Sequence, residues 1–299
     1  MHRQTSTAMT MTVPFSIPFL ENEVNATRLS GDCEAEVLRF LAQRPLHTVA
    51  MTGFIQDNGL VSPLNRGTFY GCRNRRGELE GVALIGHATL METKTDRALQ
   101  AFAELARKCT TTHMIMGEQR RIDEFWGYYS GDGQAMRRAC RELLFELTFP
   151  VQVREEVPEL RLATLQDIDL VMPVHAQMAF EESGIDPMET DALGFRERSV
   201  RRIQQGRTWV WIEQGKMIFK ADVISDTADV IYLEGVWVAE EKRGAGQGLC
   251  CMSQLARNLL QGSMSICLLV NENNRAAQAF YERAGFKLRA LYDTVFLQM

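Results

Sequence analysis

Two parts of the chain repeat the same order of strand-like and helix-like hydrophobic patterns. Residues 208–212 and 217–224 are rich in β-branched and aromatic residues on either side of a turn, which predicts a hairpin. Residues 69–72 and 82–85 have the same pattern in the first half. In each half a helix, a strand and a second helix are expected next. This order predicts an α/β fold with a mixed α+β sheet, built from two tandem units related by a degenerate internal repeat.

A polar segment separates the two patterns. It lies between Pro150 and Pro158 and contains the charged run 154–156, a composition typical of a linker. At 299 residues the chain is longer than one typical domain, which agrees with two units. We therefore predict one domain at residues 1–156 and a second at residues 157–299.

The clearest chemical signal is a glycine-rich turn between a predicted strand at residues 230–238 and a predicted helix that reaches about Gln261. The turn reads Arg243, Gly244, Ala245, Gly246, Gln247 and Gly248. Glycines let the backbone approach a ligand, and the first N–H groups of a helix have no partner of their own, so the pattern favours a bound phosphate. Such turns also connect strands to helices without any ligand. The turn lacks the Lys-Ser/Thr pair of a P-loop and lies too late for an N-terminal dinucleotide fingerprint.

A second motif follows closer to the C-terminus. Asn274 is placed to cap a short helix that carries Ala277 and Tyr281 on its inward face, and Gly285 before Phe286 is a typical helix end. Asn, Gly and the helical spacing between them predict this helix without reference to any ligand.

Together the two motifs resemble the signatures of the GNAT superfamily of acyl-CoA-dependent N-acetyltransferases. The family pattern Arg/Gln-x-x-Gly-x-Gly/Ala matches Arg243, Gly246 and Gly248, and the later Asn-x-x-Ala-x-x-x-Tyr pattern matches the segment that begins at Asn274. The resemblance extends over about residues 160–299. It implies two tandem GNAT-like domains, of which the second carries the cofactor site.

The resemblance also implies acetyl-CoA (coenzyme A) as the cofactor. Its pyrophosphate would lie on the glycine turn, and its pantetheine arm would pair with the preceding strand. The residues implied in cofactor binding are Val236, Trp237, Val238, Arg243, Gly244, Ala245, Gly246, Gln247, Gly248, Leu249, Asn274 and Tyr281. The helix-loop-helix expected at residues 167–205 would lie over the acceptor pocket.

Acetyl transfer by direct attack requires a neutral amine, yet an alkylamine with a pKa of about 10.4 is mostly protonated at pH 7. A general base is therefore expected. Glu234 is our candidate, because on a strand it shares a face with Tyr232 and Val236, where partial burial would raise its pKa. Gly235 beside it would permit a bulge. The alternative for Glu234 is an ion pair with a neighbouring strand, or simple exposure to water.

Tyr281 is the candidate acid that protonates the leaving thiolate, although without the motif a core tyrosine would be the better interpretation. His175 lies on a helix expected to line the pocket, and we leave it out of the catalytic set because a lone histidine more often packs or faces solvent. Glu181, Glu182 and Asp186 would attract a cationic amine, although acids at a helix end are more often a solvated surface.

The first unit lacks the cofactor equipment. Residues 91–96 stand where the glycine turn would be, and they contain no glycine and end in Asp96, which places an acid near the phosphate position. Trp126 lies near the position of the second motif's tyrosine. We therefore expect the N-terminal unit to pack against its neighbour or shape the acceptor pocket.

Composition narrows the class of protein. The net charge of −5 argues against a general nucleic-acid binder, and no apolar run approaches the roughly 18 residues of a membrane span. Seven cysteines without a C-x-x-C spacing favour neither a disulfide framework nor a zinc site, so we expect no metal and a cytoplasmic location. Residues 1–19 make a poor signal peptide, and we interpret them as a loose tail.

These observations predict an enzyme, an N-acetyltransferase that moves an acetyl group from acetyl-CoA to a primary amine of a small molecule or peptide. The alternative from another class is a non-catalytic acyl-CoA-binding sensor or interaction protein on the same fold. A third possibility is the transfer of a longer acyl chain to an amino acid. The sequence does not identify the acceptor, the acyl chain length, the role of the N-terminal half or the oligomeric state.

Overall fold

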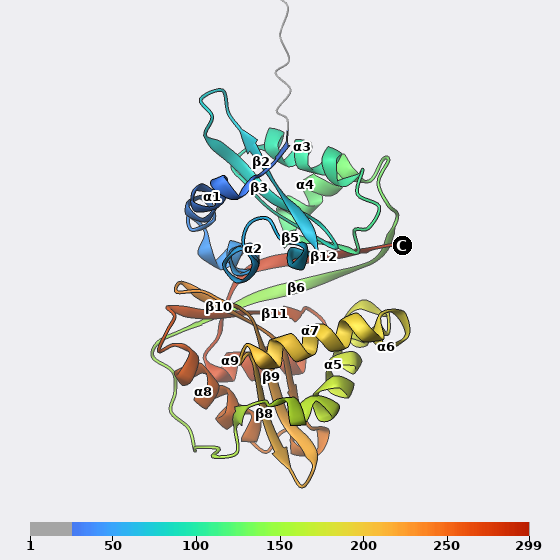
Figure 1. Ribbon diagram of the computed structural model, residues 1–299. Coiled ribbons are helices and arrows are strands. Elements are labelled where there is room, and N and C mark those ends of the chain that lie inside the picture. The colour runs from blue at the N-terminus through green and yellow to red at the C-terminus, as the bar shows by residue number, and fades with distance from the viewer. Residues whose placement is uncertain (1–25, 299) are drawn as a thin grey trace, which may run out of the picture.

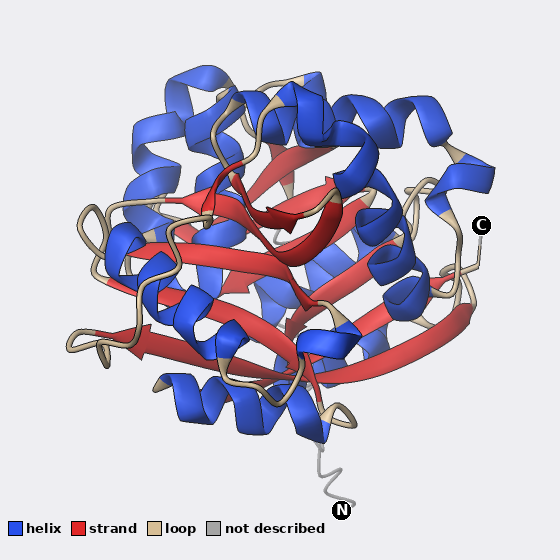
Figure 2. Cartoon of the chain, turned by 90° about the horizontal axis from the view of Figure 1, so that it is seen from below, coloured by secondary structure: helices blue, strands red, loops and turns tan. Residues whose placement is uncertain are grey.

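Strand pairing joins the two halves of the chain into one mixed sheet (Figure 1). The computed structural model describes residues 26–298, so the tail expected at residues 1–19 lies outside the described residues. Within residues 26–298 the sheet has twelve strands, and Figure 2 shows it curved, with helices packed on both sides.

In the N-terminal half, residues 26–156, the elements are β1 (Thr27–Arg28), α1 (Glu34–Leu41), α2 (Pro45–Asn58), β2 (Gly67–Arg73), β3 (Leu79–Gly86), β4 (Ala88–Thr93), α3 (Asp96–Ala106), β5 (Met114–Glu118), α4 (Gln119–Tyr129) and β6 (Met136–Thr148). In the C-terminal half, residues 157–298, they are β7 (Arg161–Leu162), α5 (Ile168–Ser183), α6 (Pro187–Thr190), α7 (Ala192–Gln204), β8 (Thr208–Glu213), β9 (Lys216–Asp226), β10 (Val230–Val238), α8 (Gln247–Leu259), β11 (Ser265–Asn271), α9 (Arg275–Ala284) and β12 (Lys287–Leu297). The expected hairpins are present, because β2 pairs with β3 and β8 with β9 in antiparallel register.

The strand order is β1-β2-β3-β4-β5-β12-β6-β11-β10-β9-β8-β7. The last strand of the chain, β12, therefore lies between β5 and β6, and it is antiparallel to both. Strand β6 in turn pairs with β11 of the C-terminal half. Figure 1 shows β6 and β12 side by side across the middle of the molecule, with α1 to α4 on one side and α5 to α9 on the other.

The hydrophobic cores follow this exchange of strands. Strand β6 contributes Phe145 and Leu147 to the core of the C-terminal half, beneath α8. Strand β12 contributes Val295 and Leu297 to the core of the N-terminal half, where Phe102 is fully buried. Each half is thus completed by a strand that the other half supplies in sequence. We predicted a boundary between two domains at residues 156 and 157, and this boundary stays a prediction.

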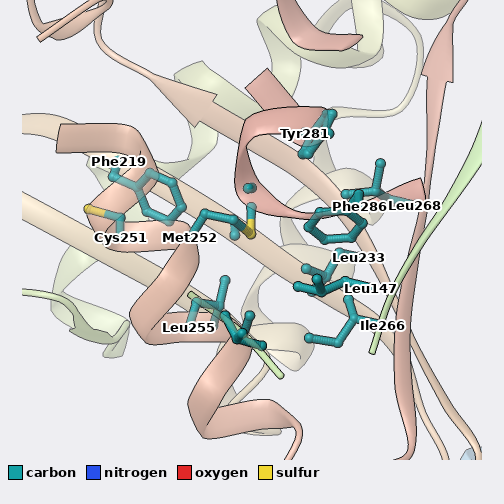
Figure 3. Packing of buried hydrophobic residues seen from close by; sticks show 14 of the residues in the cluster. Leu147, Phe219, Leu233, Cys251, Met252, Leu255, Ile266, Leu268, Tyr281 and Phe286 are labelled. Atoms are coloured by element: carbon teal, nitrogen blue, oxygen red, sulfur yellow. The ribbon is translucent and has the colours of Figure 1, made fainter. Parts of the chain in front are cut away.

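The core of the C-terminal half fixes α8 against the sheet. Met252 and Leu255 recur at helical spacing on the buried face of α8, and Figure 3 shows them facing Phe286 and Ile266 across the cluster. Cys251 lies beside Phe219 in the same view, so this thiol packs as a small apolar group. The packing holds the N-terminal end of α8 close to the end of β10.

We expect neither half to fold alone when the chain is divided after residue 156. Residues 1–156 would lack β12 and residues 157–299 would lack β6, which would leave long unpaired edges prone to aggregation. Each fragment should show no cooperative thermal unfolding, whereas co-expressed fragments should copurify and unfold cooperatively. The measurement is circular dichroism during heating, with the intact chain as control. A fragment 1–156 that unfolds cooperatively at the temperature of the intact chain would contradict this expectation.

Candidate active site

The site is built around a gap between two parallel strands. Strand β10 pairs with β11 at Val230, Ile231 and Tyr232, and the pairing stops there. Beyond that point β10 continues along β9, whereas β11 continues along β6 as far as Asn271. The expected bulge is present at Gly235, where φ is +59° and the register with β9 shifts. The two strands therefore separate after Tyr232, beside Glu234 and before the glycine turn.

A cleft of about 880 Å³ follows this gap through the sheet. Its two sides are β10 from Leu233 to Val236 and β11 from Leu268 to Asn271. Helix α9 contributes Tyr281, and α5 and α7 form the wall on the other face. The cleft thus extends along the gap from α9 to the helices α5 and α7 of the expected acceptor side.

The glycine turn leaves the N-terminus of α8 open. Gly246 is the N-cap residue, with φ at +85°, and it provides no side chain to satisfy the first helical N–H groups. A Cβ atom at Gly244 or Gly246 would meet no heavy atom within 4 Å, so the backbone is accessible there. The turn therefore presents unpaired donors and the positive end of the helix dipole to any anion that approaches.

Two other residues of the turn have structural roles. A Cβ atom on Gly248 would lie 3.0 Å from Val238 Cγ2 and 3.3 Å from Phe280, so this glycine allows α8 to pack closely against β10 and α9. Arg243 donates from Nε to the carbonyl of Val238 at 3.0 Å, while its side chain is about half exposed. The guanidinium is thereby held at the mouth of the turn, where one of its outer nitrogens lies 3.6 Å from the exposed Glu240 carboxylate.

Three carboxylates converge in the cleft, and we call Glu142 of β6, Glu182 of α5 and Glu234 of β10 the acidic cluster. Burial, and then Glu234 and Glu142, raise the pKa of Glu182 to about 8. Burial raises the pKa of Glu142, and the charge of Glu234 raises it further. A hydrogen bond of 2.5 Å that Thr294 donates to Glu142 opposes both effects. The Glu182 side chain is exposed to the cleft, and the cleft walls that surround it account for the burial that raises its pKa.

Sequence reasoning anticipated part of this cluster. Glu234 lies in the gap as expected, but the expected partial burial is not found, because the separated strands leave its side chain exposed to the cleft. Of the acids expected near the pocket, Asp186 instead caps α6, where its side chain accepts from Met188 N at 2.8 Å. Glu142 was not predicted, since nothing in the sequence placed β6 beside β11.

Tyr281 lies where α9 meets the cleft. Its side chain is buried against Phe286, as Figure 3 shows, and burial raises the pKa of its hydroxyl. Among residues 26–298 no hydrogen-bond partner is found for this hydroxyl. Asn274 caps α9 as predicted, because its side chain accepts from Ala277 N at 3.0 Å.

A buried ionic network supports the bulge. Asp222 accepts from the Lys220 ammonium and lies 2.5 Å from His175 Nε2, and all three side chains are buried. Burial would raise the pKa of Asp222, but the Lys220 ammonium and His175 outweigh it and hold that pKa well below its usual range. Lys220 also donates to the carbonyl of Gly235 at 3.2 Å. His175 is therefore engaged in the network, which agrees with leaving it out of the catalytic set.

The equivalent place in the N-terminal half is reduced to a small cavity of about 40 Å³. Strands β4 and β5 are parallel and pair only as far as Leu90, but Arg44, the N-cap residue of α2, bridges them through Glu92 at 3.2 Å and Glu118 at 2.6 Å. Thr95 caps α3, because its side chain accepts from Ala98 N at 3.3 Å. The helix that would face a cofactor phosphate therefore already has its cap.

Two further observations concern the described residues alone. No group of three or more His, Cys, Asp or Glu side chains is arranged to hold a metal ion between residues 26 and 298. None of the helices in this range has both the length and the apolar character that crossing a bilayer requires.

Comparison with known proteins places this site in a family context. Residues 204–288 match the family model described as an acetyltransferase (GNAT) domain. A search of curated proteins finds no match. Among solved structures, a Drosophila protein is similar with a TM-score of 0.66 and 12% identity, covering 91% of this chain and 98% of its own.

Two GNAT structures extend the comparison. A GNAT acetyltransferase from Colwellia psychrerythraea has a TM-score of 0.56 and 12% identity, covering 92% of this chain and 99% of its own. A tandem GNAT protein from the clavulanic acid biosynthesis pathway has a TM-score of 0.56 and 12% identity, and it also covers 92% and 99%. At these identities the likeness establishes the fold, including its division into two GNAT-like units. Residues 204–288 are therefore similar to a GNAT acetyltransferase domain, within a chain whose fold is similar to that of a tandem GNAT protein.

Proposed function

We propose that the protein is an N-acetyltransferase that transfers the acetyl group of acetyl-CoA to a primary amine of a small molecule or peptide. The observation that carries the proposal is the gap between β10 and β11, which opens beside the uncapped N-terminus of α8 and contains Glu234 and Tyr281. An unpaired strand edge and two candidate proton-transfer groups thus share one cleft, and the proposed phosphate site follows the same strand, β10, in the chain.

The cofactor would be held mainly by backbone groups. Its pyrophosphate fits the open donors that follow Gly246, and Arg243 adds a charge at the mouth. The amide groups of the pantetheine arm would pair with the β10 edge at Val236, Trp237 and Val238, which β11 leaves free. The GNAT family supplies the expectation that acetyl-CoA is the donor.

The proposed reaction is a single displacement. The amine nitrogen forms a bond to the acetyl carbon, the carbon–sulfur bond of the thioester breaks, and its electron pair leaves with sulfur. Glu234 accepts the proton that the amine loses, and Tyr281 donates the proton that converts the thiolate to free coenzyme A. The two protons move on opposite sides of the gap, which agrees with Glu234 on β10 and Tyr281 on α9.

The acidic cluster favours the entry of a protonated amine. When all of its carboxylates are ionised they repel one another, so the cluster tends to keep a proton. An ammonium group can take the place of that proton, because its positive charge relieves the same repulsion. With a Glu182 pKa of about 8, the cluster gains its full negative charge as the pH rises through that value. In this proposal the ammonium passes its first proton to another carboxylate of the acidic cluster and becomes a neutral amine, and Glu234 accepts the second proton as the amide forms.

Cofactor binding should depend on the open helix terminus. A Gly246→Glu substitution places a carboxylate at the phosphate position and forces a side chain onto a residue with φ at +85°. We expect it to weaken acetyl-CoA binding about 10- to 100-fold, the range for losing hydrogen bonds to a charged group. Calorimetric titration measures the change, with Gly262→Glu beyond the other end of α8 as the charge-matched control. Equal binding by both variants would remove the glycine turn from the cofactor site.

Turnover should depend on the Glu234 carboxylate. Glu234→Gln keeps the size of the side chain but cannot accept a proton, so we expect kcat/KM to fall about 10²- to 10⁴-fold. The test is release of free coenzyme A against a panel of amines across pH, with Glu197→Gln on the outer face of α7 as control. An unchanged pH profile for Glu234→Gln, with the loss found instead in Glu182→Gln, would move the base to α5.

Tyr281→Phe should separate chemistry from binding. The variant keeps the buried ring and loses only the hydroxyl, so we expect kcat to fall about 10²-fold while the Kd for acetyl-CoA stays unchanged. Tyr128→Phe, at an exposed tyrosine, is the control. Full turnover in both Glu234→Gln and Tyr281→Phe would remove these two residues from the reaction. If the wild type binds acetyl-CoA but acetylates no amine, the protein acts as an acyl-CoA sensor.

A further inference from the structure

The wall of the cleft formed by α7 is basic. Phe195, Arg198, Ser199 and Arg202 all line the cleft, and their spacing puts them on one face of the helix. The whole chain carries a net charge of −5, so the positive charge on this face does not follow from the composition.

The N-terminal half adds a guanidinium to the same wall. Arg66 lines the cleft with φ at +53°, in the left-handed region that a residue with a Cβ rarely adopts. Burial and then the charge of Arg198 lower the pKa of Arg66, against the opposing charge of Asp191. No ion pair of Arg66 within 4.0 Å is found between residues 26 and 298. The guanidinium of Arg66 therefore lies within the electrostatic reach of Arg198, and one carboxylate, Asp191, acts on both.

Nearby carboxylates do not neutralise this wall. Asp191 pairs with Arg198 at 2.9 Å. Asp222 lies 3.6 Å from Arg202, but it is already paired with the Lys220 ammonium. Two carboxylates thus face three cations, and the guanidinium from the N-terminal half adds a fourth. An excess of positive charge remains on this side of the cleft.

The negative charge of the cleft is concentrated elsewhere. The carboxylates of the acidic cluster act on one another at the gap between β10 and β11. Arg66 and Arg198 act instead on each other, at the junction of the two halves. The cleft therefore has an acidic region where acetyl transfer is proposed and a basic region on the wall.

We propose that the acceptor is an amine that also carries a carboxylate or phosphate group, which Arg66 and Arg198 bind while the amine lies at the acidic cluster. This proposal rests on the proposed acetyl transfer for the identity of the reacting amine. Guanidinium groups form paired hydrogen bonds with the planar oxygens of both anions, and they keep their charge at all physiological pH values. Arg202 adds to the field of the basic wall from the next turn of α7.

The test uses matched acceptors that differ in charge. The carboxylate arm is a series of ω-amino acids from glycine to 6-aminohexanoate, each compared with its neutral amide, and the phosphate arm compares O-phosphoethanolamine with ethanolamine. Binding is measured by calorimetry and acetylation by release of coenzyme A. In one of the two arms we expect an anionic amine to bind about 10- to 100-fold more tightly than its neutral counterpart, the range for a charge-assisted hydrogen-bonded pair.

The variants Arg66→Gln and Arg198→Gln should remove most of this preference and raise KM with little change in kcat. Arg196→Gln, at an exposed arginine on the outer face of α7, should retain it. Equal binding of charged and neutral members, or no binding by any of them, would overturn the anionic acceptor. Charge-selective binding without acetylation of any amine would support the basic subsite and overturn the proposed acetyl transfer.

Discussion

The hydrogen bonding of β12 on both of its edges is the constraint on which the rest of this structure depends. Because β12 pairs with β5 on one side and with β6 on the other, no edge separates the two halves of the sheet. The same arrangement brings β6 to β11 and so places Glu142 in the cleft, with Thr294 of β12 donating to it. The N-terminal half thereby supplies part of the wall of the cleft.

The two halves share a strand geometry but differ in the side chains around it. Each contains two parallel strands whose pairing ends early, β4 with β5 and β10 with β11. In the N-terminal half Arg44 fills the space with ion pairs to both strands, and Thr95 satisfies the helix that follows. In the C-terminal half the space stays open and Gly246 leaves the helix uncapped. Local side chains, and not the fold, decide which half offers a site to a ligand.

Sequence reasoning succeeded where the signal was local. The Asn274 cap, the bulge at Gly235 and the uncapped helix after the glycine turn were predicted from residues that lie next to one another in the chain. It failed where distant strands meet, because Glu142 and Arg66 acquire their places only through the strand exchange between the halves. Hydrophobic period identifies a strand but carries no information on its neighbours in the sheet.

The buried network beneath the bulge connects the acidic and basic regions of the cleft. Burying the charge of Lys220 or of Asp222 alone would cost several kcal/mol of folding free energy. Each charge is therefore buried only because the other is present, and the pair adds little net stability. The pair instead fixes the local geometry. Lys220 donates a hydrogen bond to the carbonyl of Gly235 at the bulge, where β10 and β9 do not pair regularly. A Cβ atom at residue 235 would lie 2.7 Å from the Lys220 ammonium, so this position suits glycine. Since Asp222 also lies near Arg202 of the basic wall, one set of charges fixes the backbone beside Glu234 and the position of α7. The spacing between the two regions is therefore set by the rigid interior of the sheet and not by mobile surface side chains.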